Sequence, residues 1–249
     1  MRVLSIDLDY IMSPSIEIYA DLYHDNNSLT RWRELFENSN FKENDFDIDT
    51  SNLLFCFNVF LKALKNCDNV SFGYEHDSIL YGIEDFSDID LINIDHHDDV
   101  FAGDFVCEES DYETGLKKEY VGIVKDDRVH EGNWIAWLVS KKKINSCVWI
   151  GNEYSRNKDR NFFNEKIVPN YLNIEKENYK FSNYKFDYIF VCLSPQYTPK
   201  KYWYYFSMFI DSYEQFTGKD AIMVPNKYEL ESRNSKINDE ILYQRTNGR

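Results

Sequence analysis

Three residues at alternate positions, Asp95, His97 and Asp99, follow a short apolar run at residues 89–94. Side chains alternate between the two faces of a strand, so residues i, i+2 and i+4 lie on the same side. Two carboxylates and an imidazole would therefore converge where a strand over this run ends. Such ligands suit a hard or borderline divalent cation such as Mn²⁺. The spacing predicts that these three residues bind metal.

A second acidic pair, Asp7 and Asp9, follows another apolar run at residues 3–6, and His76 follows a third run. A two-metal site needs at least one bridging carboxylate, and Asp7 and Asp95 are the natural candidates for that role. A bridged metal pair lowers the pKa of a bound water molecule and gives hydroxide near neutral pH. We therefore interpret these run ends as parts of one hydrolytic site, with Asp7 and Asp95 as catalytic and metal-binding residues.

Three further polar residues lie near the ends of the predicted strands. His96 and Asp98 would point away from the metal-binding side, which favours structural roles. Glu153 follows the apolar run that ends at Ile150. Its carboxylate could pair with a planar guanidinium through two parallel hydrogen bonds. A solvent-exposed loop glutamate is the alternative interpretation.

The elements that must position these residues alternate along the chain. We predict strands at residues 2–6, 69–74, 89–94, 146–150 and 186–193. We predict helices at residues 51–65, with Thr50 or Ser51 as the N-cap, and at residues 133–141 and 201–216. This alternation favours an α/β protein with a mainly parallel sheet in a three-layer αβα arrangement. Ligands bind beyond the carboxyl ends of the strands in such sheets. We treat residues 1–249 as a single domain.

Composition narrows the classes of partner. Asp and Glu number 43 and Lys and Arg number 28, which gives a formal charge of −15. Phosphate repels so acidic a chain, so we expect no nucleic-acid partner, whereas guanidinium or ammonium substrates would be attracted. No apolar run reaches the roughly 18 residues of a membrane helix. The five cysteines form no CxxC motif, and a strand rather than a signal peptide opens the chain. We therefore expect a cytoplasmic protein, of open oligomeric state.

The motifs Ser5-x-Asp7-x-Asp9, Glu75-His76 and Asp95-x-His97-x-Asp99 together resemble the ligand motifs of the arginase–ureohydrolase superfamily. The resemblance implies an arginase/deacetylase-like fold and two Mn²⁺ ions per chain. It also implies the ligand sets. One ion would be held by Asp7, His76, Asp95 and Asp99, and the other by Asp7, Asp9, Asp95 and His97.

The order of these motifs departs from that of ordinary arginases, in which the Asp-x-Asp strand comes late in the chain. Here it comes first, and residues 190–199 occupy the late position without the acids. This order, with Gly132-Asn133-Trp134, resembles a divergent branch formed by the peptide arginases and their relatives. The resemblance implies that a hydroxide bridging two Mn²⁺ ions attacks an arginine side chain of a ribosomally made peptide, giving ornithine and urea. The implied partner is that peptide, with or without a leader region.

Residues 130–134 supply the remaining candidates. His130 resembles the histidine that passes a proton to the leaving amine in the superfamily, and the unperturbed imidazole pKa of about 6.5 suits that task. Alternatively, Gly132 and Asn133 form only a turn and a helix cap. We take His130 as a catalytic candidate, and Asn133 and Glu153 as candidates for substrate binding.

Three other classes of function share some of these motifs. Asp95-His96-His97 and an N-terminal Asp-x-Asp also resemble the DHH phosphoesterases, but the chain has no Gly-Gly-Gly-His segment and no basic cluster near its motifs. A haloacid-dehalogenase-like phosphatase would use Asp7 as its nucleophile and leave the histidines unexplained. The third alternative is a non-catalytic protein that binds metal or peptide.

Overall fold

The computed structural model describes residues 1–13, 46–99, 129, 131–155, 171–181 and 185–224. Its strands are β1 (Arg2–Asp7), β2 (Val70–Gly73), β3 (Ile89–Ile94), β4 (Ile144–Ile150), β5 (Tyr171–Asn173), β6 (Tyr188–Cys192) and β7 (Ile222–Met223). Its α-helices are α3 (Thr50–Leu64), α4 (Leu80–Ile83), α6 (Trp134–Ser140) and α7 (Trp203–Thr217). The 3₁₀ turns are η1 (Leu8–Ile11), η3 (His76–Ile79), η6 (Lys176–Asn178) and η7 (Lys200–Tyr202).

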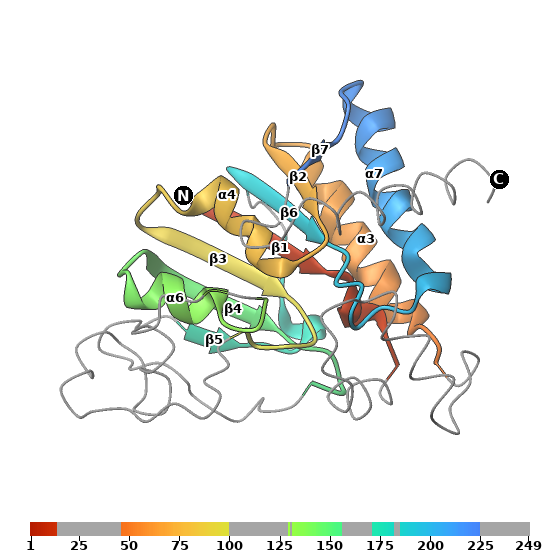
Figure 1. The fold of residues 1–249 in the computed structure, drawn as a ribbon, viewed down its shortest axis with the longest axis horizontal. Coiled ribbons are helices and arrows are strands. Elements are labelled where there is room, and N and C mark those ends of the chain that lie inside the picture. Colours follow the sequence, from red (N-terminus) through yellow and green to blue (C-terminus); the bar gives the residue numbers. More distant parts are fainter. Residues whose placement is uncertain (14–45, 100–128, 130, 156–170, 182–184, 225–249) are drawn as a thin grey trace.

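All these strands belong to one sheet, in the order β5-β4-β3-β1-β6-β2-β7, and every adjacent pair is parallel (Figure 1). β1 is the central strand. Its neighbours are β3, with Ile6 opposite Ile94, and β6, with Asp7 opposite Cys192. This register places the carboxyl ends of β1, β3 and β6 side by side. The α/β class and the mainly parallel sheet predicted from the sequence are confirmed.

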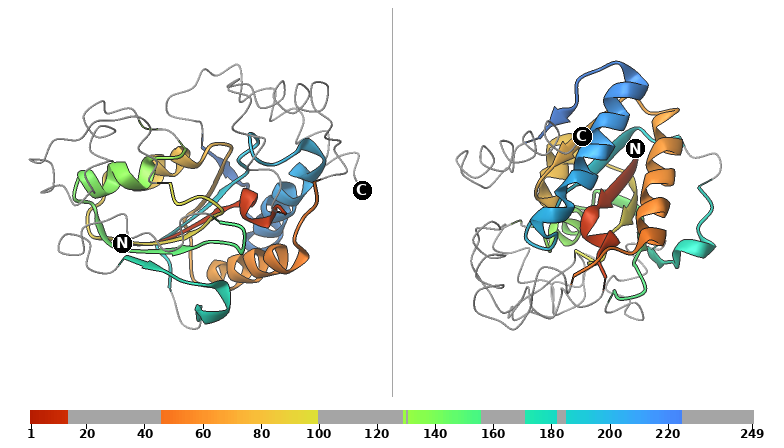
Figure 2. Two further views of the ribbon diagram at one scale, coloured as in Figure 1. Left: turned by 90° about the horizontal axis from the view of Figure 1, so that it is seen from below. Right: turned by 90° about the vertical axis from the view of Figure 1, so that its right-hand side faces the viewer.

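Helices cover both faces of the sheet, because the strands are apolar on both sides. In β1, Leu4 and Ile6 pack in the cluster that includes α3 and α7, whereas Val3 packs in the cluster that includes α4 and α6. β6 divides in the same way, since Val191 belongs to the first cluster and Phe190 to the second. Figure 2 shows the two helix pairs on opposite sides of the sheet. This arrangement is compatible with a three-layer αβα fold.

The predicted elements differ from the observed ones mainly at their ends. α3 is capped by Asp49, whose carboxylate accepts hydrogen bonds from the backbone N–H groups of Ser51 and Asn52. The prediction of Thr50 or Ser51 as the cap is wrong, because Asp49 is the last residue with an extended backbone (φ −82°, ψ 108°). The short edge strands β5 and β7 were not predicted from the sequence.

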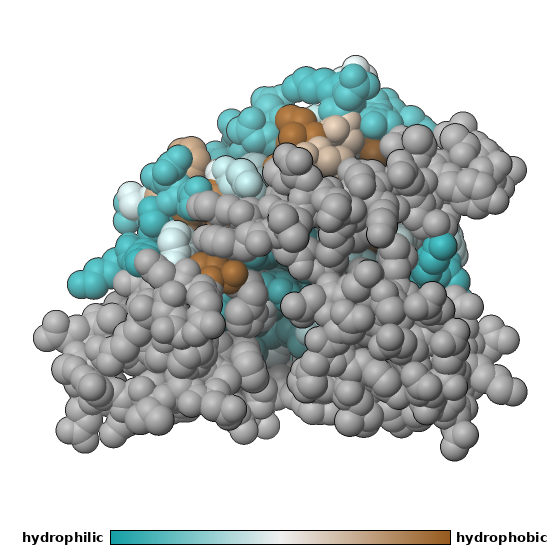
Figure 3. Space-filling model, in the orientation of Figure 1, coloured by the Kyte–Doolittle hydropathy of each residue, from teal (hydrophilic) through white to brown (hydrophobic). Residues whose placement is uncertain are grey.

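The surface carries only scattered apolar side chains where it is described. On the face shown in Figure 3 the described residues are largely hydrophilic, with small separate hydrophobic areas. Several large exposed apolar side chains lie singly, for example Leu54, Leu172 and Ile222, whereas Tyr204 and Met208 lie about one turn apart on α7. Isolated residues of this kind are normal on soluble domains. None of the described helices combines the length and apolar character required to cross a membrane.

A close contact between α4 and β6 gives a test of the packing. A Cβ atom added to Gly82 would lie 2.2 Å from Cζ of Tyr188, which is itself buried. Because overpacking a core costs about 1–3 kcal/mol, we expect Gly82→Ala to lower the free energy of unfolding by about 3 kcal/mol in urea denaturation. Gly218→Ala is the control, since φ is +68° there but nothing lies within 4 Å. That change should cost about 1 kcal/mol, and a greater loss at Gly218 than at Gly82 would contradict this packing.

Candidate metal centre

The candidate ligands come together where three strands of the sheet end. Asp7 is the last residue of β1, and Asp9 follows in η1. Asp95 directly follows β3, which pairs with β1. His76 opens η3 after β2, and β6 lies between β2 and β1. Parallel strands present their carboxyl ends at one edge, so residues from distant parts of the chain form a single site.

The first group surrounds the imidazole of His76. Its Nδ1 atom lies 2.8 Å from Oδ2 of Asp99, 3.0 Å from Oδ2 of Asp95 and 3.2 Å from Oδ2 of Asp7. All four side chains are buried. Asp99 reaches this position with a left-handed backbone (φ 53°). The four ligands that the resemblance implies for one ion therefore lie together.

The second group contains Asp9, Asp95 and His97, and its potential ligand atoms lie within 4.8 Å of one another. Nδ1 of His97 lies 2.7 Å from Oδ2 of Asp9, and the backbone N–H of His97 donates to Oδ1 of Asp95 (2.8 Å). Asp95 thus belongs to both groups, as a bridging ligand must. Asp7 belongs to the first group, and its Oδ1 accepts from the backbone N–H of Asp9 (3.1 Å).

The electrostatics of the site favour a bound cation. Burial raises the pKa values of Asp7, Asp9 and Asp99. Burial together with the neighbouring carboxylates raises the pKa of Asp95 to about 6. Burial alone would lower the pKa of His76, but the surrounding carboxylates raise it well above its usual value. The pKa of His97 is also raised well above its usual value, because the neighbouring carboxylates, Asp9 above all, outweigh the effect of burial.

The donor set also fits a divalent cation geometrically. Nδ1 of His76 carries at most one hydrogen, yet three carboxylate oxygens lie within 3.2 Å of it. A proton can serve one of these oxygens, whereas a metal ion can contact several at once. Carboxylate oxygens and imidazole nitrogens are ligands that Mn²⁺ accepts. Both groups could therefore hold such an ion.

Neutral side chains orient the ligands from outside. The hydroxyl of Ser5 lies 2.6 Å from Nε2 of His76. With a metal ion at Nδ1, the Nε2 atom would carry the hydrogen and donate it to Ser5, which would fix the tautomer that a metal ligand needs. The other partners are Ser194, which donates to Asp7 (2.5 Å), Asn93, which donates to Asp95 (3.2 Å), and Trp134, which donates to Asp99 (2.5 Å).

Sequence reasoning gave none of these four orienting residues a role. Ser5 and Asn93 could have been found, because each lies two residues before an aspartate, on the same face of its strand. Ser194 and Trp134 carry no such signal. They follow β6 and open α6, and only the fold brings them to Asp7 and Asp99.

The other residues singled out from the sequence lie elsewhere. Nδ1 of His96 lies 3.0 Å from Oδ1 of Asn152, which agrees with a structural role. Glu153 is exposed in the turn after β4. Asn133 is buried at the start of α6, next to Trp134. His130 lies outside the described residues. Neither Glu153 nor Asn133 belongs to the candidate metal-binding groups, so their roles in substrate binding stay predictions.

Comparison of the chain with protein-family models, with curated proteins and with solved structures gave no match. The site itself must therefore carry the functional argument. It offers two adjacent sets of carboxylate and imidazole ligands that share Asp95. Such a site can bind a pair of divalent cations.

The shared carboxylate predicts an unequal response to mutation. We expect Asp95→Ala to strip both metal ions, because each group loses a ligand, and His97→Ala to weaken one ion only. Asp98→Ala is the matched control, since Asp98 lies in the same segment but outside both groups. Metal content after dialysis against Mn²⁺, measured by mass spectrometry, gives the stoichiometry. A full complement of metal in Asp95→Ala would contradict the shared role.

The raised pKa values predict the pH dependence of metal binding. Folding without metal raises the pKa of Asp95 from 3.8 to about 6, so the metal-free protein loses stability as pH rises through that window. The raised pKa values of His76 and His97 act in the same direction. Metal must displace these protons, so Mn²⁺ should raise the melting temperature more at about pH 7.5 than at about pH 5.5. An equal increase at both pH values in thermal unfolding would contradict this coupling.

Proposed function

We propose that this protein is an arginase-like metallohydrolase that converts arginine side chains of a peptide to ornithine with release of urea. The observation that carries the proposal is the position of Asp95 between two histidine-containing groups. Sharing one carboxylate is what a binuclear hydrolytic site requires. We infer the substrate from the resemblance of the motifs to those of the peptide arginases. The early position of the Asp7-x-Asp9 motif in the chain supports this choice.

Six residues would hold two Mn²⁺ ions. They are Asp7, Asp9, His76, Asp95, His97 and Asp99. When bound, such a pair supplies hydroxide near neutral pH. In the reaction, water adds to the guanidinium carbon, the bond from that carbon to Nε breaks, and a proton passes to the departing amine. We assign that proton transfer to His130, with Asn133 and Glu153 as contacts of the substrate.

The charge around the site favours a cationic substrate over a phosphate ester. In the described part of the chain, no lysine or arginine forms an ion pair with Asp7, Asp9, Asp95 or Asp99. Phosphoesterases usually pair their substrate's charge with such cations. Two bound Mn²⁺ ions would offset the four carboxylates, so the attraction of a guanidinium would come from the overall charge of −15 on the chain. We infer a cytoplasmic location as well, since the four described cysteines are free and buried.

The test is mass spectrometry of an arginine-containing peptide after incubation with Mn²⁺-loaded protein, with free arginine in parallel. We expect the peptide to lose CH2N2 per modified arginine, which is the difference between arginine and ornithine, and urea to appear. Asp95→Ala should show no turnover. Conversion of free arginine alone would indicate an ordinary ureohydrolase. A protein that binds both ions but converts neither substrate would favour the non-catalytic alternative.

The role of His130 can be separated from metal binding. We expect His130→Ala to lower kcat by about 10²- to 10⁴-fold, the usual contribution of a general acid or base. Its metal content should match that of the wild type, as measured by mass spectrometry of the metal. His96→Ala provides a comparison, because the His96 imidazole lies 3.0 Å from Asn152 and belongs to neither ligand group, although its ring packs against that of His97 (4.9 Å between centroids). Loss of metal in His130→Ala would make it a ligand instead of a proton donor.

A further inference from the structure

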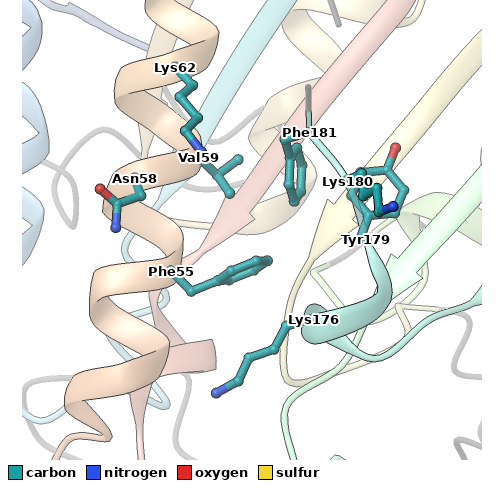
Figure 4. Close-up of a pocket in the computed structure, with 8 residues that line it drawn as sticks. All are labelled: Phe55, Asn58, Val59, Lys62, Lys176, Tyr179, Lys180 and Phe181. Carbon is teal, nitrogen blue, oxygen red and sulfur yellow. The ribbon is translucent and has the colours of Figure 1, made fainter. Parts of the chain in front are cut away.

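A groove outside the candidate metal centre lies between α3 and the segment 176–181 (Figure 4). Its volume of about 410 Å³ is within the range of ligand-binding sites. Three lysines and three aromatic residues dominate its lining. We call it the lysine groove, and its lining includes Phe55, Lys62, Lys176, Tyr179, Lys180 and Phe181.

The cations of the lysine groove stand out in a chain of charge −15. Lys62 and Lys180 form no ion pair or hydrogen bond with any described residue. Lys176 donates to Oγ of Ser51 (2.8 Å) and to Oδ1 of Asn52 (2.5 Å), and it lies 4.0 Å from Oε1 of the exposed Glu177, so its charge is partly compensated and a ligand would meet chiefly Lys62 and Lys180. The ammonium groups that line the groove repel one another, so binding of an anionic ligand would lower the electrostatic energy of the groove.

The floor of the groove is apolar and lies between cationic ends. Phe55 and Phe181 contact each other edge to face, with ring centroids 5.7 Å apart. Figure 4 shows Lys62 toward one end and Lys176 at the other, with the two rings between them. A ligand with an apolar group between two acidic groups would match this arrangement.

One residue links the groove to the candidate metal centre. The ring of Tyr10, which follows Asp9, lies 6.1 Å from the ring of Phe55. The carbonyl of Tyr10 accepts hydrogen bonds from Nδ2 of Asn52 (3.3 Å) and Nδ2 of Asn152 (3.0 Å). Asn52 belongs to the helix that forms one wall of the groove. Tyr10 is itself buried, so these contacts show that the groove and the candidate metal centre are neighbours in the fold.

We propose that the lysine groove binds a second segment of the peptide substrate, in which an aromatic side chain lies between acidic residues. This inference rests on the proposed function, because the same peptide would present its arginine to the metal centre. The groove would take the acidic segment of the peptide and the metal centre would take its arginine, so the peptide would bind in one direction only. Charge complementarity of this kind contributes chiefly to specificity.

The test compares two labelled arginine-containing peptides on the full Mn²⁺-loaded protein. One carries Asp-Phe-Asp, and the other carries Asn-Phe-Asn at the same place. Fluorescence anisotropy measures binding, and mass spectrometry measures conversion. The double variant Lys62→Gln/Lys180→Gln removes two groove cations. Lys65→Gln is the matched control, because Lys65 is exposed at the end of the same helix and does not line the groove.

We expect the double variant to bind the acidic peptide about threefold to thirtyfold more weakly, as for exposed ion pairs. Its binding of the amide peptide, its metal content and its kcat should be unchanged. Equal binding of both peptides by the wild type would overturn the inference. Lysine-dependent binding of inorganic phosphate without binding of either peptide would also overturn it. Lysine-dependent binding without conversion would support the groove as a peptide site and overturn the proposed reaction.

Discussion

The candidate metal centre depends on keeping four carboxylates buried beside two imidazoles. Burying a charge is costly unless an opposite charge compensates it. The hydroxyls, the indole and the amide around the ligands are neutral, so they can orient the carboxylates but cannot neutralise them. Without metal, protons on the imidazoles provide part of the compensation, in line with the raised pKa values of His76 and His97. A pair of divalent cations would provide the rest while leaving the carboxylates ionised.

The parallel sheet makes this concentration of charge possible. The ligand-carrying ends of β3 and β1 are adjacent at its centre, and the end of β2 lies one strand further, beyond β6. Apolar layers pack against both faces of the sheet. The loop after β6 also contributes side chains that contact the candidate ligands. Ser194 donates to Asp7 in the first group, and the ring of Tyr197 lies 4.6 Å from that of His97 in the second. A single loop thus contacts both groups, so its conformation affects both together.

The strand at residues 89–94 and its polar end could be predicted, because a short apolar run followed by alternating ligands is a local pattern. β5 and β7, with three and two residues, are too short to show any period. The cap of α3 was missed because Asp49, Thr50 and Ser51 can all cap a helix, and only the backbone decides among them. Trp134 contacts Asp99 across the fold, which no local pattern could reveal.

The position of β6 has a consequence for the order of events during synthesis. Asp7 belongs to the first strand made, and His76 follows the second, but β6 separates these two strands in the sheet. The two side chains therefore cannot reach their final distance until residues 188–192 have left the ribosome and paired with both neighbours. Contacts between residues so distant in sequence form slowly. A newly made chain would thus carry its ligands for some time before it could retain metal, which makes assembly of the centre one of the last steps of folding.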